Sequence, residues 1–171
     1  SVVETFIKQL VDKKCNKLTL TDERMTRFLL PLNEAVNLVN LAEKSRVYGQ
    51  IYIKKAPSAK IIDVAKACMK LLNIKKKIEY IGIRLGEKLH ETLISSEESI
   101  FVKEYFNHFI IQNKKNLKGS DYLHPEKKFT KKMFTYSSDN QKMLNIDGII
   151  KLLKKDKYIA DFLKSYKINL K

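Results

Sequence analysis

The sequence predicts an α/β fold with a small, mostly parallel sheet, flanking helices and a helical C-terminus. Segments of helical and strand-like periodicity alternate within residues 1–98, an order typical of parallel strands joined by helices. Two apolar patterns of helical spacing follow Asn145 near the C-terminus. The chain has 171 residues, of which 44% are hydrophobic, so one folded domain with its own core is expected.

The first elements follow from the spacing of apolar residues. Val2 to Leu10 has helical spacing and predicts a helix, whereas Lys17 to Thr21 alternates in polarity and predicts a strand. Leu29 to Leu32 contains a proline, and the residue before a proline avoids helical conformations, so this segment is expected to be extended. Asn33 is a suitable N-cap for a helix whose apolar face comprises Ala35, Leu38, Val39 and Ala42.

Two more strands and a helix are expected before residue 85. The strands are predicted at Gly49 to Lys54 and at Ile78 to Arg84. The helix between them follows the turn at Ala56-Pro57-Ser58, and its apolar face comprises Ile61, Val64, Ala65, Cys68 and Leu72. This alternation of strands and helices is the main reason for expecting parallel pairing.

The stretch from Ile81 to Glu91 is the main candidate for a functional site. It begins as a strand, breaks at Gly86 and continues with helical spacing at Leu89, Leu93 and Ile94, which predicts a junction between a buried strand and a helix. Ligands of open α/β sheets bind at the carboxyl ends of strands, and Arg84 next to a helix N-terminus could hold an anion there. The alternative is an ordinary turn with a surface arginine.

The pattern changes after residue 98. Tyr105 to Gln112 predicts an outer strand, Asn113 to Lys132 a long lysine-rich surface excursion, and Tyr136 to Asn140 a polar turn. Asn145 is expected to cap a helix, and a last helix follows. The expected segments are therefore residues 1–98, 99–135 and 136–171, packed into one compact domain.

The net charge of +15 leaves two classes of function open. A basic chain can be a non-enzymatic binding module for nucleic acid or anionic surfaces. However, lysines spread over the whole length supply most of the charge and are typical of a solvated surface, so a nucleic-acid partner is not the first expectation. The four arginines are more informative, because a guanidinium group binds phosphate with a bidentate fork.

Other features exclude several classes of protein. No apolar run approaches the roughly 20 residues of a transmembrane helix, so no membrane partner is expected. Cys15 and Cys68 form no Cys-x-x-Cys pattern, which indicates free thiols in a reducing cytoplasm. The three histidines lack metal-ligand spacing, so no metal site is predicted.

Two motifs together carry a family resemblance. Met25-Thr26-Arg27-Phe28 and the stretch from Gly82 to Glu91, with Ile53 to Ser58 between them, resemble the C-terminal part of the bacterial UDP-N-acetylglucosamine 4,6-dehydratases. These NAD(P)-dependent enzymes of the extended short-chain dehydrogenase/reductase superfamily make activated sugars for capsule, O-antigen or flagellar glycans. The resemblance runs from Ser1 to about Glu98 and resumes weakly between Tyr136 and Leu153.

The resemblance implies a role for five residues. Arg27 and Arg84 match family arginines that contact the diphosphate of the nucleotide sugar, and Glu87 matches an acid near the nucleotide. Leu18 and Leu20 match positions that flank the base. Two guanidinium forks that converge on a diphosphate would bind and orient a UDP-sugar, in this family a UDP-N-acetylhexosamine.

The sequence also departs from the family pattern. Its five glycines form no dinucleotide-binding fingerprint, and no tyrosine has a lysine four residues later. The resemblance therefore implies the substrate-binding portion without the NAD(P)-binding half, so no cofactor is expected in this chain and no turnover by it alone. A separate N-terminal half or a second copy of the chain is the expected protein partner, and a truncated product, a split enzyme and a part of a longer chain stay open.

Overall fold

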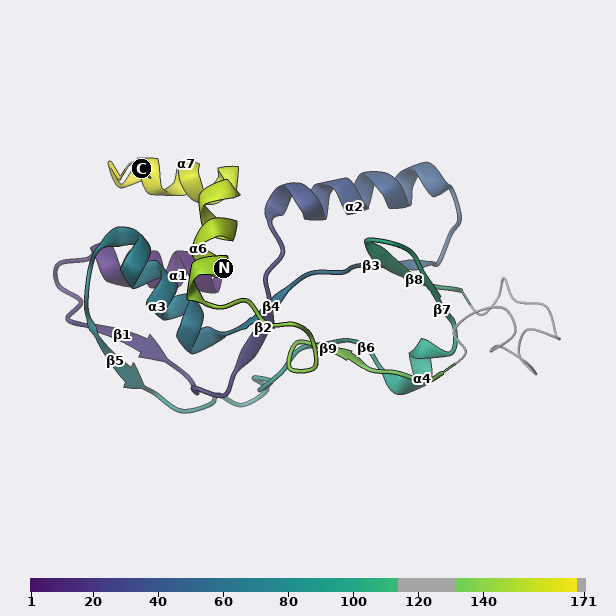
Figure 1. Ribbon diagram of the computed structural model, residues 1–171, viewed down its shortest axis with the longest axis horizontal. Helices are drawn as coiled ribbons and strands as arrows, with labels where there is room; N and C mark the ends of the chain where they lie inside the picture. The colour runs from purple at the N-terminus through teal and green to yellow at the C-terminus, as the bar shows by residue number, and fades with distance from the viewer. Residues whose placement is uncertain (114–131, 169–171) are drawn as a thin grey trace.

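The computed structural model describes residues 1–113 and 132–168, which form an α/β fold of short sheets with flanking helices (Figure 1). The predicted fold class and the helical C-terminus are confirmed. The helices are α1 (Val2–Val11), α2 (Leu32–Ser45), α3 (Ile61–Leu72), α4 (Ser96–Ser99), α6 (Ile146–Lys155) and α7 (Lys157–Ser165). The strands are β1 (Lys17–Leu20), β2 (Thr26–Phe28), β3 (Ile51–Lys54), β4 (Ser58–Lys60), β5 (Lys77–Tyr80), β6 (Thr92–Ile94), β7 (Val102–Glu104), β8 (His108–Ile111) and β9 (Tyr136–Ser137).

The first core lies among α1, α3, α6 and α7, which gather on one side of the molecule (Figure 1). Each helix contributes apolar residues at helical spacing, as the sequence predicted, and the buried ones include Phe6, Ile7, Val64, Ile149 and Leu163. Asn145 caps α6, because its side-chain oxygen accepts a hydrogen bond of 2.8 Å from the backbone N–H of Gly148.

The strand pair β1–β5 packs against this core. The two strands are parallel, with Lys17 opposite Lys77 and Leu20 opposite Tyr80. The side chains of Leu18 and Leu20 point into the core, whereas Thr19 points away and receives a hydrogen bond of 2.7 Å from the side chain of Gln9. The alternation of this strand is therefore the one that the sequence predicted.

The second core lies between the sheet β3–β8–β7 and the strand pair β6–β9. Its buried side chains are Ile53, Ile94, Val102, Phe109, Ile111 and Tyr136. Their positions span all three segments that the sequence predicted, so residues from distant parts of the chain build one cluster.

The prediction of a mostly parallel sheet is wrong. Among the strands that the structure describes, only β1 and β5 form a parallel pair, and the other strand pairs are antiparallel. Strands β7 and β8 are joined by a short hairpin connection, which permits only antiparallel pairing. The strand predicted at Tyr105 to Gln112 is found at β8, but it is the central strand of its sheet and not an outer one.

The predicted strand-to-helix junction at Ile81 to Glu91 is also wrong. Strand β5 ends at Tyr80, residues 81–91 form an irregular loop, and β6 follows where a helix was expected. Gly82 and Gly86 have φ angles of 82° and 80°, a left-handed conformation that favours glycine and interrupts regular structure. Leu93 is exposed and Ile94 is buried, which is the alternation of a strand.

Helix α2 differs from its prediction in two ways. It begins at Leu32 with Pro31 at the N-cap, so the expected cap at Asn33 lies inside the helix. None of its residues is buried, although the sequence predicted a core-facing apolar stripe. The lysine-rich segment predicted from Asn113 to Lys132 falls almost entirely outside the described residues.

Candidate functional site

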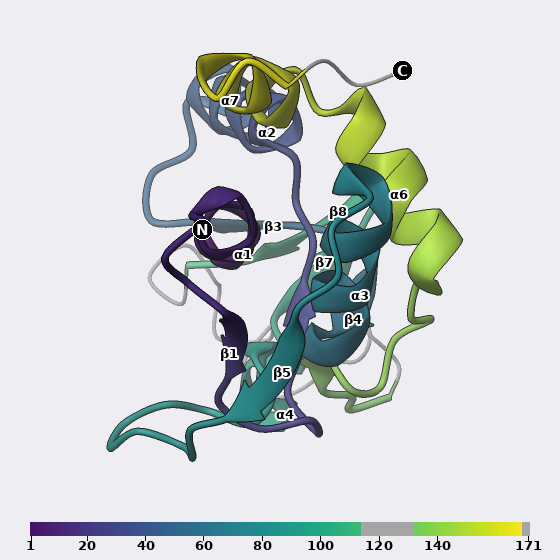
Figure 2. The same ribbon diagram turned by 90° about the vertical axis from the view of Figure 1, so that its left-hand side faces the viewer.

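The loop of residues 81–91 leaves the carboxyl end of β5 beside the carboxyl end of β1 (Figure 2). The backbone N–H of Ile81 donates a hydrogen bond of 2.8 Å to the carbonyl of Leu20, which fixes the start of the loop on β1. Ile81, Ile83 and Leu85 are exposed, so the loop projects from the sheet instead of packing on the core. This is the edge of a parallel strand pair at which ligands of α/β proteins bind.

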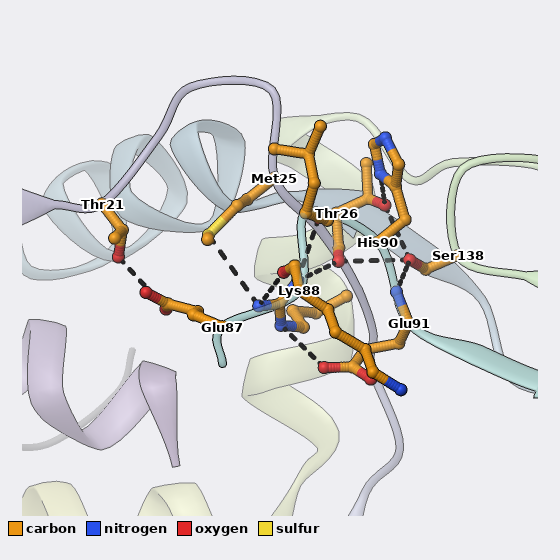
Figure 3. Close-up of polar contacts among 10 residues, drawn as sticks. Thr21, Met25, Thr26, Glu87, Lys88, His90, Glu91 and Ser138 are labelled. Atoms are coloured by element: carbon orange, nitrogen blue, oxygen red, sulfur yellow. Dashed lines mark hydrogen bonds and ion pairs between the residues drawn. The ribbon is translucent and has the colours of Figure 1, made fainter. Parts of the chain in front are cut away.

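Glu87 closes a turn within this loop. Its carboxylate accepts a hydrogen bond of 3.2 Å from the backbone N–H of Arg84 and one of 3.3 Å from the hydroxyl of Thr21. The backbone N–H of Glu87 donates 3.0 Å to the carbonyl of Arg84. The contact between Thr21 and Glu87 is visible in Figure 3. Glu87 therefore holds the turn that presents Arg84.

The Arg84 side chain is exposed at the tip of this turn. Within residues 1–113 and 132–168, its guanidinium group has no hydrogen-bond or ion-pair partner. By contrast, Arg24 on the turn after β1 is paired with Asp22 through two contacts of 3.0 and 2.8 Å. These hydrogen bonds hold the pKa of Asp22 at about 2. The fork of Arg84 is therefore open to a ligand, whereas that of Arg24 is occupied.

Arg27, on β2, holds the other end of the loop. Nη1 donates to the carbonyls of Thr26 (2.7 Å) and Leu89 (3.1 Å). Nη2 donates to the carbonyl of Lys88 (2.8 Å) and approaches Sδ of Met25 (3.8 Å). Nε lies 3.4 Å from the carboxylate of Glu91. All three guanidinium nitrogens of Arg27 therefore face groups of the protein.

A buried cluster of hydroxyl groups supports the same end of the loop (Figure 3). Ser138 Oγ lies 2.6 Å from Thr26 Oγ1, donates to the carbonyl of Thr26 (3.1 Å) and accepts from the backbone N–H of Glu91 (2.9 Å). Thr26 Oγ1 also lies 2.8 Å from Nδ1 of His90. Ser138 is fully buried. Neither Thr26 nor Ser138 was predicted as a site residue: Thr26 lies in the motif Met25-Thr26-Arg27-Phe28, and Ser138 lies in the predicted polar turn at residues 136–140.

Two hollows lie next to these residues. The first, of about 370 Å³, is at the carboxyl ends of β1 and β5 and is lined by Thr21, Asp22, Glu23, Arg24, Tyr80 and Gly82. The second, of about 630 Å³, is mostly apolar and lies between α2, α7 and the start of α1, with Arg27 at its wall. The first hollow adjoins the base of the loop that carries Arg84.

The structure places the five predicted site residues in three kinds of position. Arg84 is exposed, Arg27 and Glu87 are partly buried and engaged with the loop, and Leu18 and Leu20 are 0% and 1% exposed. The side chains of the two leucines are enclosed by the first core, so a ligand could contact only their backbone. Arg27 and Arg84 lie at the same loop. Arg27 contacts its carboxyl end from β2, and Arg84 lies in its turn.

The described residues do not fit a dinucleotide cofactor. Such a cofactor places its diphosphate at a glycine-rich turn between a strand and a helix. In the described part of the chain, β4 continues into α3 at Lys60–Ile61 without a glycine, and the loop with Gly82 and Gly86 leads to a strand. No chemical step through NAD(P) is therefore assigned to these residues.

No described helix combines the length and apolar character needed to span a membrane.

A model of the family described as "Polysaccharide biosynthesis protein" matches residues 1–113, which is more than half of the chain. The matched range contains the loop of residues 81–91 with Arg84, and also Arg27 on β2.

Similar proteins extend the comparison to almost the whole chain. The UDP-glucose 4-epimerase of Rickettsia bellii (strain OSU 85-389) is 36% identical over 166 residues, and the match covers 96% of this chain and 48% of the relative. The UDP-glucose 4-epimerase of Rickettsia akari (strain Hartford) is 35% identical with the same coverage. The chain spans about half the length of the curated relatives it matches.

A solved structure shares the fold. The X-ray structure of Pen from Bacillus thuringiensis matches with a TM-score of 0.76 and 28% sequence identity, over 92% of this chain and 45% of that chain.

Proposed function

Because the chain belongs to the polysaccharide biosynthesis protein family, we propose that it forms part of the nucleotide-sugar site of an epimerase or 4,6-dehydratase. Relatives named UDP-glucose 4-epimerase support a UDP-sugar as the ligand. The resemblance to UDP-N-acetylglucosamine 4,6-dehydratases narrows the proposed ligand to a UDP-N-acetylhexosamine. Synthesis of capsule, O-antigen or flagellar glycans is the corresponding proposed role.

One observation carries this proposal: the exposed guanidinium of Arg84 on a turn that Glu87 and Thr21 fix. Charge-assisted hydrogen bonds between a guanidinium fork and phosphate oxygens are among the stronger polar contacts in proteins. A turn that is already ordered loses little conformational entropy on binding. The neighbouring hollow offers the exposed ring of Tyr80 beside this turn for the nucleotide.

The proposed contribution of this chain is binding and orientation. Arg84 would offset the charge of the diphosphate. The fixed loop would set the direction in which the sugar extends from the bound diphosphate. Holding a substrate in a reactive orientation is a large part of enzymatic rate enhancement. We propose that this chain binds UDP-sugars without binding NAD(P).

Isothermal titration calorimetry with UDP-N-acetylglucosamine, UDP-glucose and NAD⁺ tests the proposal. We expect heat with the UDP-sugars and none with NAD⁺. Arg84→Ala is expected to weaken UDP-sugar binding by about 10- to 100-fold, the range for loss of charged hydrogen bonds. Arg46→Gly removes the same charge at the exposed C-cap of α2, where the φ angle of 51° suits glycine, and is expected to change affinity by less than about threefold, because Arg46 lines neither the turn nor the first hollow. Equal losses in both variants, or no heat with any UDP-sugar, would refute the proposal.

The net charge of +15 favours a second candidate, a basic module that binds nucleic acid or anionic surfaces. This candidate requires affinity for single-stranded DNA that falls steeply with salt, and no preference for UDP-sugars. Titration of fluorescent oligonucleotides at 50 and 200 mM NaCl distinguishes the two. Tight binding of DNA at 50 mM NaCl that weakens steeply at 200 mM NaCl, together with no heat from UDP-sugars, would favour the second candidate.

A further inference from the structure

The guanidinium group of Arg27 is already committed to the protein. Its three nitrogens face the carbonyls of Thr26, Lys88 and Leu89, the sulfur of Met25 and the carboxylate of Glu91. A direct contact with a diphosphate would have to replace several of these. Each replaced hydrogen bond leaves a polar group of the loop without its partner, which is unfavourable where the group is partly buried.

A segment far away in sequence holds the same residues. Ser138, in the turn after β9, fixes the backbone on both sides of the contact between β2 and the loop: its Oγ accepts from the N–H of Glu91 and donates to the carbonyl of Thr26. Its backbone N–H donates 2.8 Å to the carbonyl of Glu91, and the N–H of Thr26 donates 3.1 Å to the carbonyl of Leu89. The loop is therefore tied at one end to two segments that are 112 residues apart.

From these contacts we infer that Arg27, Thr26 and Ser138 form a latch that sets the conformation of the loop, and that Arg27 is a positioning residue. Arg84 is then the arginine that touches the diphosphate, and Arg27 acts through the loop backbone. The role toward the diphosphate rests on the proposed function, whereas the latch itself rests only on the contacts within the chain. The resemblance assigned both arginines to direct contact, so the inference changes the role of one of them.

The chemistry of lysine distinguishes the two roles of Arg27. A lysine keeps the positive charge, but its single nitrogen cannot donate to carbonyls on both sides of a planar fork. If Arg27 touches the diphosphate as a charge, Arg27→Lys retains much of the affinity. If Arg27 positions the loop, Arg27→Lys loses affinity although the charge is kept.

Two measurements on the same variants test the latch. Hydrogen exchange of backbone amides, followed by NMR on the free protein, reports the order of the loop. UDP titration by calorimetry reports its consequence. We expect exchange at Glu91 to become about tenfold faster in Ser138→Ala, because its acceptor is removed, and exchange at Glu87 and Glu91 to become faster in Arg27→Lys. Amides of β1 and β5 are expected to keep their rates, and Arg46→Gly, at the exposed C-cap of α2, is the control for loss of charge.

Affinity for UDP is expected to fall about tenfold in Arg27→Lys and in Ser138→Ala. Arg84→Ala is expected to lose affinity with unchanged exchange in the loop. Unchanged loop exchange in both latch variants would overturn the latch. Faster exchange with unchanged affinity for UDP, or full affinity in Arg27→Lys, would overturn the positioning role. If the unaltered chain bound no UDP, the proposed function would fail, and the exchange rates would still decide whether the latch exists.

Discussion

Tyr136 connects two distant segments of the second core through its hydroxyl group. The hydroxyl accepts a hydrogen bond of 3.0 Å from the N–H of Ala56 and donates one of 3.2 Å to the carbonyl of the same residue. The ring stacks on Phe28 at 4.9 Å between centroids and meets the edge of Phe109 at 5.1 Å. The tyrosine therefore satisfies a backbone donor and acceptor inside an otherwise apolar cluster.

Replacement of Tyr136 by phenylalanine tests this role. Tyr136→Phe keeps the ring and leaves both backbone groups of Ala56 unpaired, so we expect a loss of about 1–3 kcal/mol in the free energy of unfolding. Urea denaturation followed by circular dichroism measures it. Tyr105→Phe, at an exposed tyrosine, is the matched control and is expected to be neutral. Equal midpoints for the two variants would contradict the account.

The thiol of Cys68 is fully buried and makes the stability of the fold depend on pH. Burial in the first core raises the pKa of its thiol from 9.0 to about 12. The unfolded chain therefore loses this proton at lower pH than the folded chain, so the stability linked to Cys68 is present below pH 9 and is lost as the pH rises toward 12. We expect the free energy of unfolding to fall less steeply between pH 9 and 10.5 in Cys68→Ala than in the unaltered chain. Equal slopes would show that the thiol is not protected, and Cys15→Ala is the control.

The network around Arg27 shows what residue-level sequence analysis can and cannot predict. The two motifs select Arg27 and Arg84, and the structure brings both arginines to the loop of residues 81–91. Their partners could not be predicted, because Lys88, Leu89 and Glu91 are brought to Arg27 by the tertiary fold, and Ser138 lies 112 residues from Thr26. The backbone carbonyls that Arg27 binds carry no signal in the sequence at all.

At the scale of elements, apolar spacing predicted four helices with their buried faces and did not predict the strand pairing. Helices α1, α3, α6 and α7 have the buried faces that their sequences predict, because each of these faces meets the first core. Strand direction depends on the connections between strands, and the connection between β7 and β8 contains no glycine or proline, so Asn107 is its one typical turn residue. The helical spacing of Leu89, Leu93 and Ile94 does not correspond to a helix, because Leu89 lies in the irregular loop of residues 81–91 and Leu93 and Ile94 lie on β6.

Helix α2 offers a direct test at this scale. Leu32, Val36 and Val39 lie at i, i+4 and i+7, and they are 52%, 49% and 67% exposed. We expect Val39→Lys to change the free energy of unfolding by less than about 0.5 kcal/mol, as for a surface position. Ile7→Ala, at a fully buried position of α1, is expected to cost about 2–5 kcal/mol. A cost above about 2 kcal/mol for Val39→Lys in urea denaturation would mean that this face is covered.

The whole molecule carries a large positive charge over two small cores. Several ion pairs in the described residues, such as Lys17–Glu79, Lys70–Asp147 and Lys164–Asp161, have exposed side chains on both partners and contribute little stability. Repulsion among the remaining cations is then the larger electrostatic effect on the folded chain. The class of fold could be predicted from composition and periodicity, whereas the division into two cores could not, since it depends on contacts between distant segments.

The charge balance leads to a prediction about salt. We expect the melting temperature to rise by a few degrees between 20 and 500 mM NaCl, because the ions screen repulsion in a chain of net charge +15. Differential scanning fluorimetry in NaCl and in sodium acetate measures the shift and, because the anion differs, separates screening from specific anion binding. A melting temperature that falls with salt in both would instead mean that ion pairs dominate.

The central claim is that the fixed turn with Arg84 binds the diphosphate of a nucleotide sugar. The most direct measurement is an NMR titration of the ¹⁵N-labelled chain with UDP-N-acetylglucosamine. The account predicts shifts of the backbone amides from Gly82 to Lys88 and of Tyr80, and no shifts in α6 and α7. Shifts confined to the helices, or an unchanged spectrum at millimolar ligand, would contradict it.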